Sequence, residues 1–233
     1  MTGRYTSAPA PASPAIDKFP DFPPRDDMMN TRHLHDQGHQ ASLRRHLGNP
    51  DTTIVLGEVP IAWDVPRGRV GVRIPDLLVA FNVRRAHILA QQGYAINEQG
   101  KPPDFVLEVA SDSTAGNDEN TKRFDYANFG ITEYWLFDPD WGRRYATGLA
   151  GWTLANERYA PIPIHQYAAD MHYGDSRALG LQVCWEYGAL RWYDPVGQRY
   201  LDTFDSLAEE RDSAVAEAQR LRDEIARLRE GRE

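Results

Sequence analysis

The chain has 233 residues, a formal net charge of −8, 41% hydrophobic residues and 11% aromatic residues, a composition that suits one globular domain with appendages. Its single cysteine, Cys184, excludes an intrachain disulfide and a cysteine-based zinc cluster. No apolar stretch reaches the roughly 20 residues that cross a bilayer, and the N-terminus lacks the layout of a signal peptide, so we expect a cytoplasmic protein.

Three parts are predicted along the chain. Residues 1–29 are rich in Pro, Ala, Ser and Asp and contain six prolines, which favours a disordered leader. Residues 30–201 carry the patterns of a folded domain, and residues 202–233 carry a helical repeat. This last part has ten acidic residues and six arginines, so its net charge of −4 is half of the total of −8.

The first predicted elements of the domain are a helix and a hairpin. A helix over 31–47 is indicated by an N-capping threonine and an apolar stripe, although Gly38 weakens it. The segments 52–65 and 69–81 are rich in β-branched residues and are joined by the turn-forming sequence Pro66-Arg67-Gly68. Together they predict an antiparallel hairpin.

Further along the chain, strands and helices alternate. A short strand is predicted at 94–97, and the continuous apolar run Phe105–Ala110 is typical of a strand buried on both faces in the middle of a sheet. Residues 111–130 predict a helix that opens with capping serines and threonine and ends at a glycine, and "EYWLF" predicts the next strand. Later segments such as 181–194 predict hairpins that extend or cap the sheet. This order predicts an α/β domain with a mixed sheet flanked by helices.

The C-terminal part has the spacing of a short coiled coil, because apolar residues recur by threes and fours. They are Phe204, Leu207, Ala214, Ala218, Leu221, Ile225 and Leu228, with Arg211 as the one polar interruption. We expect this helix to form a homodimer with a second copy, in parallel or antiparallel orientation. About four heptads are marginal for an isolated pair, so a helix that is mobile or packed on its own domain is the alternative.

One glutamate, Glu108, stands inside the apolar strand, where a charged carboxylate is costly unless it is neutralised, paired or bound to a metal. Asp76 heads another apolar run, and Lys122 lies on the helix that follows the strand. Two acids and an amine around one cavity are the layout of a magnesium-dependent phosphodiester hydrolase, in which the lysine orients or deprotonates the attacking water. The residues alone leave a second interpretation open, in which Asp76 caps a strand end and Glu108 forms a buried salt bridge with Lys122.

Several segments carry a resemblance to a known family. They are "IPDLLVAF", "PPDFVLEVASDST", "DENTKRFDYANFGITEYWLFDP" and the C-terminal stretch that begins "YDPVGQRYLDTFDSL". From about Thr31 onward the chain resembles the Uma-two family of restriction-endonuclease-like proteins, a branch of the PD-(D/E)XK nuclease superfamily. The most specific positions are Pro75, Asp76, Glu108, Val109, Ala110, Ser111, Asp118, Lys122, Tyr126, Gly130, Glu133, Tyr134 and Trp135. The resemblance implies a restriction-endonuclease-like fold, a mixed sheet flanked by helices.

The resemblance also implies roles for individual residues. Asp76 and Glu108 would be the metal-binding acids for Mg²⁺ or Mn²⁺, the main-chain carbonyl of Val109 would be a third ligand, and Lys122 would be the catalytic lysine. The superfamily's usual pattern has the lysine two residues after the glutamate, where this chain has Ala110. The resemblance therefore implies that the amine has moved to the following helix.

The implied activity is that of a metal-dependent endonuclease that acts on nucleic acid, with DNA as the leading substrate and RNA left open. Two other functions compete with it. One is a catalytically silent nucleic-acid-binding domain on the same fold, and the other is an interaction protein organised by the coiled coil. A membrane partner is not expected.

Four groups are weaker candidates. His33, His35 and His39 could share a zinc ion, and Asp118 lies one turn before the lysine. Glu58 and Asp64 of the hairpin could add an outer metal ligand, and Arg67, Arg69 and Arg73 could face phosphates. For each group a plainer role is commoner: a surface or capping histidine, an acid at a helix N-terminus, and solvated surface charges.

Overall fold

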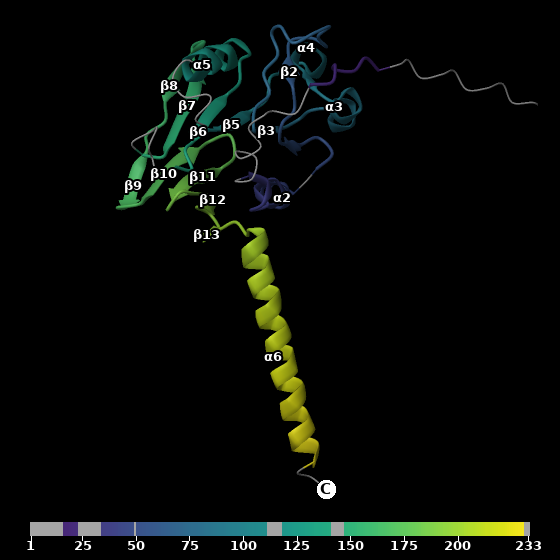
Figure 1. The fold of residues 1–233 in the computed structure, drawn as a ribbon, viewed down its shortest axis with the longest axis vertical. Helices are drawn as coiled ribbons and strands as arrows, with labels where there is room; N and C mark the ends of the chain where they lie inside the picture. Colours follow the sequence, from purple (N-terminus) through teal and green to yellow (C-terminus); the bar gives the residue numbers. More distant parts are fainter. Residues whose placement is uncertain (1–15, 23–33, 49, 111–117, 141–146, 231–233) are drawn as a thin grey trace, which may run out of the picture.

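Residues 16–22, 34–48, 50–110, 118–140 and 147–230 are described by the computed structural model. Two stacked sheets with helices at their margins lie at one end, and a single long helix extends away from them (Figure 1). None of the helices in these ranges is long and apolar enough to span a membrane.

A six-stranded mixed sheet forms the centre of the domain. In spatial order its strands are β1 (Ile54–Leu56), β3 (Leu77–Ala80), β5 (Phe105–Val109), β6 (Glu133–Phe137), β7 (Leu149–Ala155) and β8 (Arg158–Pro161). Of these neighbours, β5 and β6 run parallel and the others antiparallel. All five residues of β5 are buried. The predicted mid-sheet strand and the mixed sheet of the predicted fold class are therefore confirmed.

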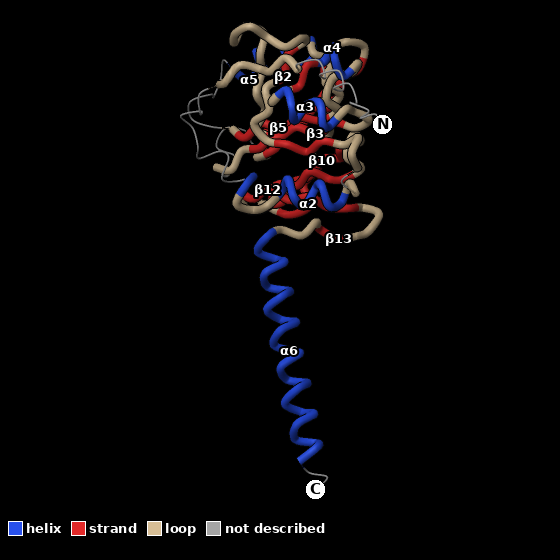
Figure 2. The backbone as a smooth tube through the Cα atoms, turned by 90° about the vertical axis from the view of Figure 1, so that its right-hand side faces the viewer, coloured by secondary structure: helices blue, strands red, loops and turns tan. Residues whose placement is uncertain are grey.

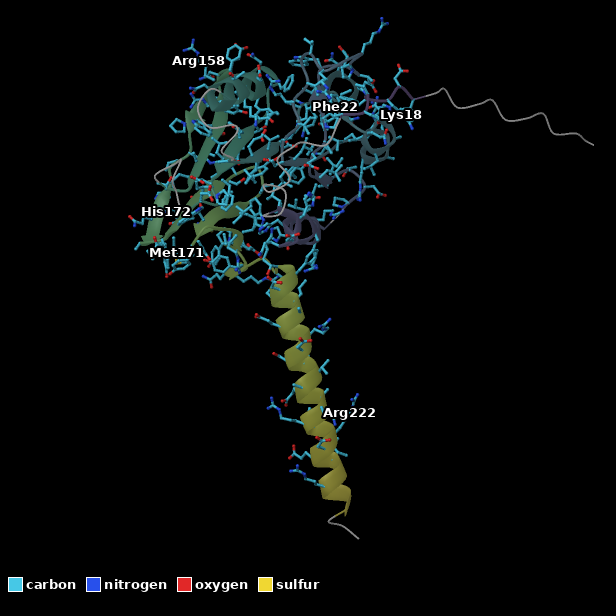
Figure 3. All side chains as sticks on the ribbon, in the orientation of Figure 1. Lys18, Phe22, Arg158, Met171, His172 and Arg222 are labelled. Carbon is cyan, nitrogen blue, oxygen red and sulfur yellow. The ribbon has the colours of Figure 1, made fainter. Side chains whose placement is uncertain are left out.

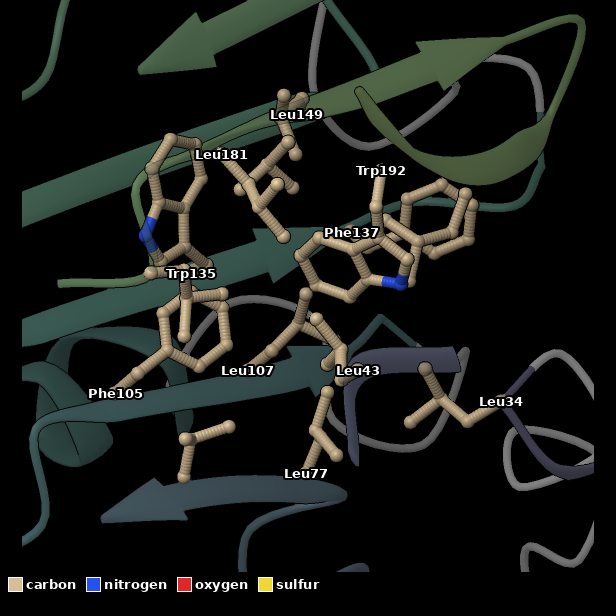
Figure 4. Close-up of a cluster of buried hydrophobic side chains, with 14 of the residues drawn as sticks. Leu34, Leu43, Leu77, Phe105, Leu107, Trp135, Phe137, Leu149, Leu181 and Trp192 are labelled. Atoms are coloured by element: carbon tan, nitrogen blue, oxygen red, sulfur yellow. The ribbon is translucent and has the colours of Figure 1, made fainter. Parts of the chain in front are cut away.

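A second, antiparallel sheet covers one face of the first. Its order is β13 (Arg199–Tyr200), β12 (Ala189–Asp194), β11 (Leu181–Glu186), β10 (Met171–Ser176) and β9 (His165–Ala168). Apolar side chains of both sheets form one buried cluster, to which the first contributes Leu107 and Trp135 and the second Leu181 and Trp192 (Figure 4). The hairpin predicted over 181–194 is present as β11 and β12, and it caps the first sheet rather than extending it.

Trp135, one of the tryptophans of this shared core, fits because two facing residues have no side chain. A Cβ atom on Gly151 of β7 would lie 2.7 Å from the Trp135 ring, and one on Gly174 of β10 would lie 2.9 Å from it. These separations are shorter than atoms tolerate, so both strands approach the indole only because they carry glycine.

The opposite face of the six-stranded sheet is covered by α5 (Asp118–Asn128), α3 (Arg85–Gln91) and α4 (Ile96–Gln99), whose apolar residues pack on those of β3, β5 and β6. Here the predicted hairpin is only partly present. β1 and β3 pair antiparallel and Ile61 forms one isolated antiparallel bridge with Arg73, but β2 (Ile61–Ala62) otherwise pairs in parallel with β4 (Tyr94–Ala95). The strand predicted at 94–97 is therefore β4 followed directly by α4.

The helix predicted over 31–47 is interrupted in the structure: Leu34 and His35 are helical, and residues 36–38 form a turn. α2 covers His39–His46, and Gly38 immediately before it has φ 73°, a left-handed conformation that interrupts a helix and favours glycine. A Cβ on Gly38 would lie 2.7 Å from the ring of Phe204, so the glycine also makes room for the start of the last helix. Residues 31–33 lie outside the described residues.

Part of the segment predicted to be a disordered leader lies against the domain. Phe19 is 4% exposed and packs in a small cluster with Ala62 and Ala95, and its main-chain N–H donates to the carbonyl of Gln91 at 2.9 Å. Residues 16–22 therefore depart from the predicted disorder, because one aromatic side chain is buried in an apolar pocket. The other residues of 1–29 lie outside the described ranges.

The last helix, α6 (Phe204–Glu230), begins at the second sheet and extends away from both sheets (Figure 2). Thr203 and Ser206 cap its start reciprocally: the Thr203 N–H donates to Ser206 Oγ at 2.8 Å, and the Ser206 N–H donates to Thr203 Oγ1 at 3.2 Å. Side chains along α6, among them Arg222, project into solvent (Figure 3). Exposed apolar residues on this helix include Val215, Leu221 and Ile225.

Candidate active site

Strand alternation directs the side chain of Glu108 toward α5. Successive residues of a strand point to opposite faces of the sheet. On β5, Phe105 and Leu107 belong to the core between the two sheets, whereas Val106 belongs to the cluster on the α5 side. Glu108 stands two residues after Val106 and therefore shares its face.

The register of β3 and β5 brings Asp76 to the same place. Leu78 of β3 pairs with Val106 of β5, and both lie in the cluster on the α5 side. The strands are antiparallel, so two residues further along the same face Asp76 stands opposite Glu108. Residues that are 32 apart in the sequence thus lie on neighbouring segments of the sheet.

Both carboxylates are buried, with 3% of Asp76 and 2% of Glu108 exposed. The main-chain N–H of Val109 donates to Asp76 Oδ2 at 2.7 Å, a charge-assisted bond that ties the end of β5 to the residue preceding β3. Asp76 thus has a structural role of the kind that the second interpretation of the sequence assigns to it. Val109 contacts the site through its amide.

Two side chains of α5 hold the two oxygens of Glu108. Lys122 Nζ lies 3.3 Å from Glu108 Oε2, and the Tyr126 hydroxyl donates to Glu108 Oε1 at 2.5 Å. Residues four apart on a helix lie on the same face, which is why one helix can supply both contacts. The Lys122 side chain is 15% exposed, so the ion pair lies close to the surface but is largely buried.

Tyr126 remains a donor across the ordinary pH range. Burial, and then the adjacent Glu108 carboxylate, raise the pKa of the Tyr126 hydroxyl well above its usual value. Both causes oppose the formation of a second negative charge beside Glu108. The phenol therefore stays protonated and keeps its hydrogen bond to the carboxylate.

A second ion pair fixes α5 to the segment that leads into Asp76. Arg73 Nε donates to Asp125 Oδ2 at 2.7 Å, and a second guanidinium nitrogen contacts the same oxygen. The pair is partly buried, with 33% and 26% of the side chains exposed. It joins the helix that supplies Lys122 to the chain three residues before Asp76, so both halves of the site are fixed relative to each other.

The domain that carries these residues matches a known family. The family model Uma2, described as "Putative restriction endonuclease", matches residues 29–172, which is more than half of the chain and includes Asp76, Glu108 and Lys122. The chain belongs to the Uma2 family. Among solved structures, it is similar to a "putative nuclease belonging to DUF820" from Anabaena variabilis, with 12% sequence identity, a TM-score of 0.39, and coverage of 63% of this chain and 74% of that chain. No curated protein matches the chain.

The Uma2 match ends within β10, so it leaves β11, β12, β13 and α6 outside. Inside it, the structure brings together Asp76, Glu108 and Lys122. It adds the Arg73–Asp125 pair, which sequence reasoning missed because the partners are 52 residues apart and neither stands in an unusual setting. Tyr126 entered the sequence analysis only through the family resemblance; its position four residues after Lys122 is the signal that could have identified it.

Asp76 and Glu108 are the residues of this site that could hold a divalent cation. No group of three or more His, Cys, Asp or Glu side chains that could hold a metal occurs within the described residues. An ion here would therefore rely on the carboxylates of Asp76 and Glu108, with main-chain oxygen and water completing its coordination. Mg²⁺ is commonly bound in this way, by one or two carboxylates and several waters.

The weaker candidates lie elsewhere or face solvent. His39 is buried, with its ring 6.2 Å from that of Trp192, whereas His35 is exposed, so these two do not face one zinc ion. Glu58 and Asp64 are exposed, and Asp64 accepts a hydrogen bond from an asparagine amide. His33 and the side chain of Asp118 lie outside what the structure describes, as do the predicted capping residues at 111–114.

Replacing Tyr126 by Phe should lower the free energy of unfolding by about 1.5 to 3 kcal/mol, because a buried carboxylate loses a charge-assisted donor. Tyr159→Phe is the matched control: its hydroxyl donates to the neutral carbonyl of Ile131 at 2.9 Å, and its loss should cost about 1 kcal/mol. Urea denaturation measures both. Equal losses in the free energy of unfolding of the two variants would contradict a charge-assisted hydrogen bond from Tyr126 to Glu108.

Proposed function

We propose that this Uma2 chain is a metal-dependent endonuclease that hydrolyses phosphodiester bonds of nucleic acid, with DNA as its substrate. One observation carries the proposal. Two buried carboxylates, Asp76 and Glu108, stand opposite each other on neighbouring strands, and the amine of Lys122 lies 3.3 Å from one of them. This is the combination of acids and amine that phosphodiester hydrolysis requires.

A comparison within the same sheet supports a functional role for Glu108. Glu133 is also buried, at 1% exposed, but its carboxylate accepts four hydrogen bonds from neutral donors contributed by both sheets. Glu108 instead faces a charged amine near the surface. A buried ion pair is a weak device for stability, because the desolvation of two charges offsets their attraction, so its presence favours a chemical role.

In the proposed mechanism each residue has a separate task. Asp76 and Glu108 hold Mg²⁺ or Mn²⁺, which, when bound, stabilises negative charge on the phosphoryl oxygens. Lys122 binds the attacking water or a phosphate oxygen through its ammonium group, and Glu108 keeps that amine in place. Tyr126 stays protonated and prevents Glu108 from rotating. The Arg73–Asp125 pair maintains the position of α5, and with it the position of Lys122.

Exposed arginines on the segment that leads to Asp76 support a polyanionic substrate. The loop that precedes Arg73 exposes Arg67 and Arg69 together with Val70, which is 97% exposed. This loop runs directly into the residues that lead to Asp76. Arginines on an exposed loop beside a hydrolytic centre can contact the phosphates on either side of the bond to be cut. They offset locally the net negative charge of the chain.

The proposal is tested by a nuclease assay with Mg²⁺ or Mn²⁺ on single- and double-stranded DNA and RNA. We expect cleavage of DNA that a chelator abolishes and that Asp76→Asn reduces at least about a hundredfold. Asp64→Asn, at an exposed aspartate, is the matched control and should cleave like the wild type. Absence of cleavage with either ion on every substrate, or full activity of Asp76→Asn, would overturn the proposal.

The two competing functions give different results in the same experiment. A catalytically silent domain would bind nucleic acid in a gel-shift assay without cutting it. A pure interaction protein would lose its function on deletion of residues 203–233 while Asp76→Ala had no effect.

A further inference from the structure

α6 carries an exposed apolar stripe with a heptad register. Its spacing of four and three residues assigns Phe204, Arg211, Ala218 and Ile225 to one seam position, conventionally a, and Leu207, Ala214, Leu221 and Leu228 to the other, d. In the monomer, half of the surface of Leu221 and of Ile225 is exposed. α6 extends away from both sheets over most of its length (Figure 1), and among the described residues Leu221 and Ile225 remain exposed on it.

The seam residues favour a two-stranded assembly. Isoleucine at a combined with leucine at d, as at Ile225 and Leu221, favours a parallel dimer over larger bundles. Ala214 and Ala218 have small side chains, so their seam positions bury little apolar surface and contribute little to the affinity of the pair. Arg211 at an a position costs stability, but a single polar residue there specifies the register of the pair.

The flanking charges distinguish the two orientations of such a pair. The g positions beside the seam are Glu210, Glu217 and Glu224, and the e positions include Arg222 and Arg229. In a parallel pair, each g residue faces the e residue five positions later on the other helix. Glu217 would then face Arg222 of the other helix. In an antiparallel pair, g faces g and e faces e, which would set glutamate against glutamate and arginine against arginine.

We propose that α6 forms a parallel, in-register homodimer with α6 of a second copy of this chain. The occupant of the exposed stripe is a second copy because the seam is self-complementary and the charges pair only between identical helices in parallel. The 27 residues of α6 extend over about 40 Å. The junction at Thr203 and Phe204 connects the start of each helix to its own domain, so the two domains lie at the same end of the pair.

The arrangement has a consequence that rests on the proposed function. Two candidate sites at one end of a parallel pair can act on the two strands of one DNA duplex, whereas an antiparallel pair would separate the domains by about the length of the helix. We infer that the substrate is double-stranded DNA that the dimer cuts on both strands, while the monomer introduces single-strand nicks.

Cysteine cross-linking in the full chain tests the orientation. Ala214→Cys and Leu221→Cys, prepared as separate variants and oxidised with diamide, should each give a covalent dimer, because every d residue of a parallel pair faces its own counterpart. In an antiparallel pair at most one of the two positions can face itself. The wild type is the control: Cys184 is buried, and its burial followed by the nearby Glu186 raises the pKa of its thiol to about 12, so it should not cross-link. A dimer from only one variant, or from neither, overturns the proposal.

A charge exchange tests the pairing independently. Glu217→Arg should weaken the dimer several-fold, and the double variant Glu217→Arg with Arg222→Glu should recover the affinity of the wild type, because the exchanged charges again face each other in a parallel pair. An antiparallel pair would recover nothing. Leu221→Asp should raise the dissociation constant more than tenfold without changing the melting temperature of the domain. Light scattering over a range of concentrations measures all three variants, and an unchanged mass for Leu221→Asp would overturn the proposal.

Cleavage of supercoiled plasmid separates this inference from the proposed function. The wild type should produce linear DNA, and Leu221→Asp at the same concentration should produce mainly nicked circles. If both proteins fail to cut although the cysteine variants cross-link, the endonuclease proposal fails and the dimer stands. If both produce linear DNA equally, the dimer has no part in double-strand cleavage.

Discussion

Millimolar Mg²⁺ or Mn²⁺ should raise the melting temperature of the wild-type protein by about 5 to 10 °C at a hundredfold excess over the dissociation constant, because binding to the folded state alone contributes about 2.7 kcal/mol. Asp76→Ala and Glu108→Ala should abolish that rise. The two acids lie opposite each other in a buried setting and repel when both are ionised, so a divalent cation relieves the repulsion.

Lys122 should behave differently from the two acids. Lys122→Ala should retain the metal-dependent rise in melting temperature and lose cleavage by about a hundredfold or more, since its proposed role concerns water or phosphate rather than the ion. Because this change leaves Glu108 without its ion pair and can destabilise the fold, Lys122→Arg serves as the second variant. It keeps the positive charge but cannot give up a proton. Restored cleavage in Lys122→Arg would indicate an electrostatic role, and absent cleavage a proton-transfer role.

The outcome that would defeat this assignment combines two measurements. One is a wild-type melting curve that is indifferent to divalent cations, and the other is full cleavage by Lys122→Ala. Asp76, Glu108 and Lys122 would then be structural, with Asp76 bonded to the Val109 amide and Glu108 in a buried salt bridge, as the residues alone allow.

Glu133→Ala should destabilise the domain more than any site variant, by about 3 to 5 kcal/mol, a large part of the stability of a typical domain. Its carboxylate accepts hydrogen bonds from Trp135 Nε1 at 3.0 Å, from Ser176 Oγ at 2.6 Å and from the amides of Arg177 and Ala178 at 2.8 and 3.0 Å. These donors come from the first sheet, from β10 of the second sheet and from the turn after β10, and the loss of the carboxylate leaves two buried donors and two partly buried amides without their acceptor.

Urea denaturation monitored by circular dichroism measures this loss. Ser176→Ala, which removes one of the four donors, should cost about 1 kcal/mol, and Glu209→Ala, at an exposed position of α6, should be neutral. If Glu133→Ala were no more destabilising than Ser176→Ala, the carboxylate would not be what joins the two sheets at this point.

Glu108 and Glu133 show how far the sequence predicts the site. The cost of burying charge identifies Glu108, inside its apolar strand, as a residue that needs partners, whereas Glu133, the first residue of "EYWLF", was not identified on that ground. For Glu108 the partner was predictable, because Lys122 lies on the next helix and the β5-to-α5 connection is local. For Glu133 the donors at 176–178 come from a sheet whose docking depends on packing between distant segments. Local pattern carries no information about that docking.

The elements of the fold can likewise be separated into those that the sequence predicts and those that it does not. The central strand β5, the helix α5 and the strand β6 follow from apolar runs and a terminating glycine, and the sequence predicts all three. Two other features were missed: the second sheet as a separate layer, and the parallel pairing of β2 with β4. Both result from competition among strands of similar propensity, which is decided by the burial of whole faces rather than by any single segment.

The indole of Trp135 restricts which residues can occupy two other positions in the chain. It occupies space that would otherwise belong to side chains at Gly151 and Gly174, one on each sheet. A larger residue at either glycine is excluded while the tryptophan is present, and replacing the tryptophan by a small residue would open room at Gly151. At Gly174 the side chain of Ile164, 2.8 Å from the same Cβ position, would also have to move. Substitutions at these three sites are therefore expected to be correlated across relatives. A smaller side chain at one position permits a larger side chain at another.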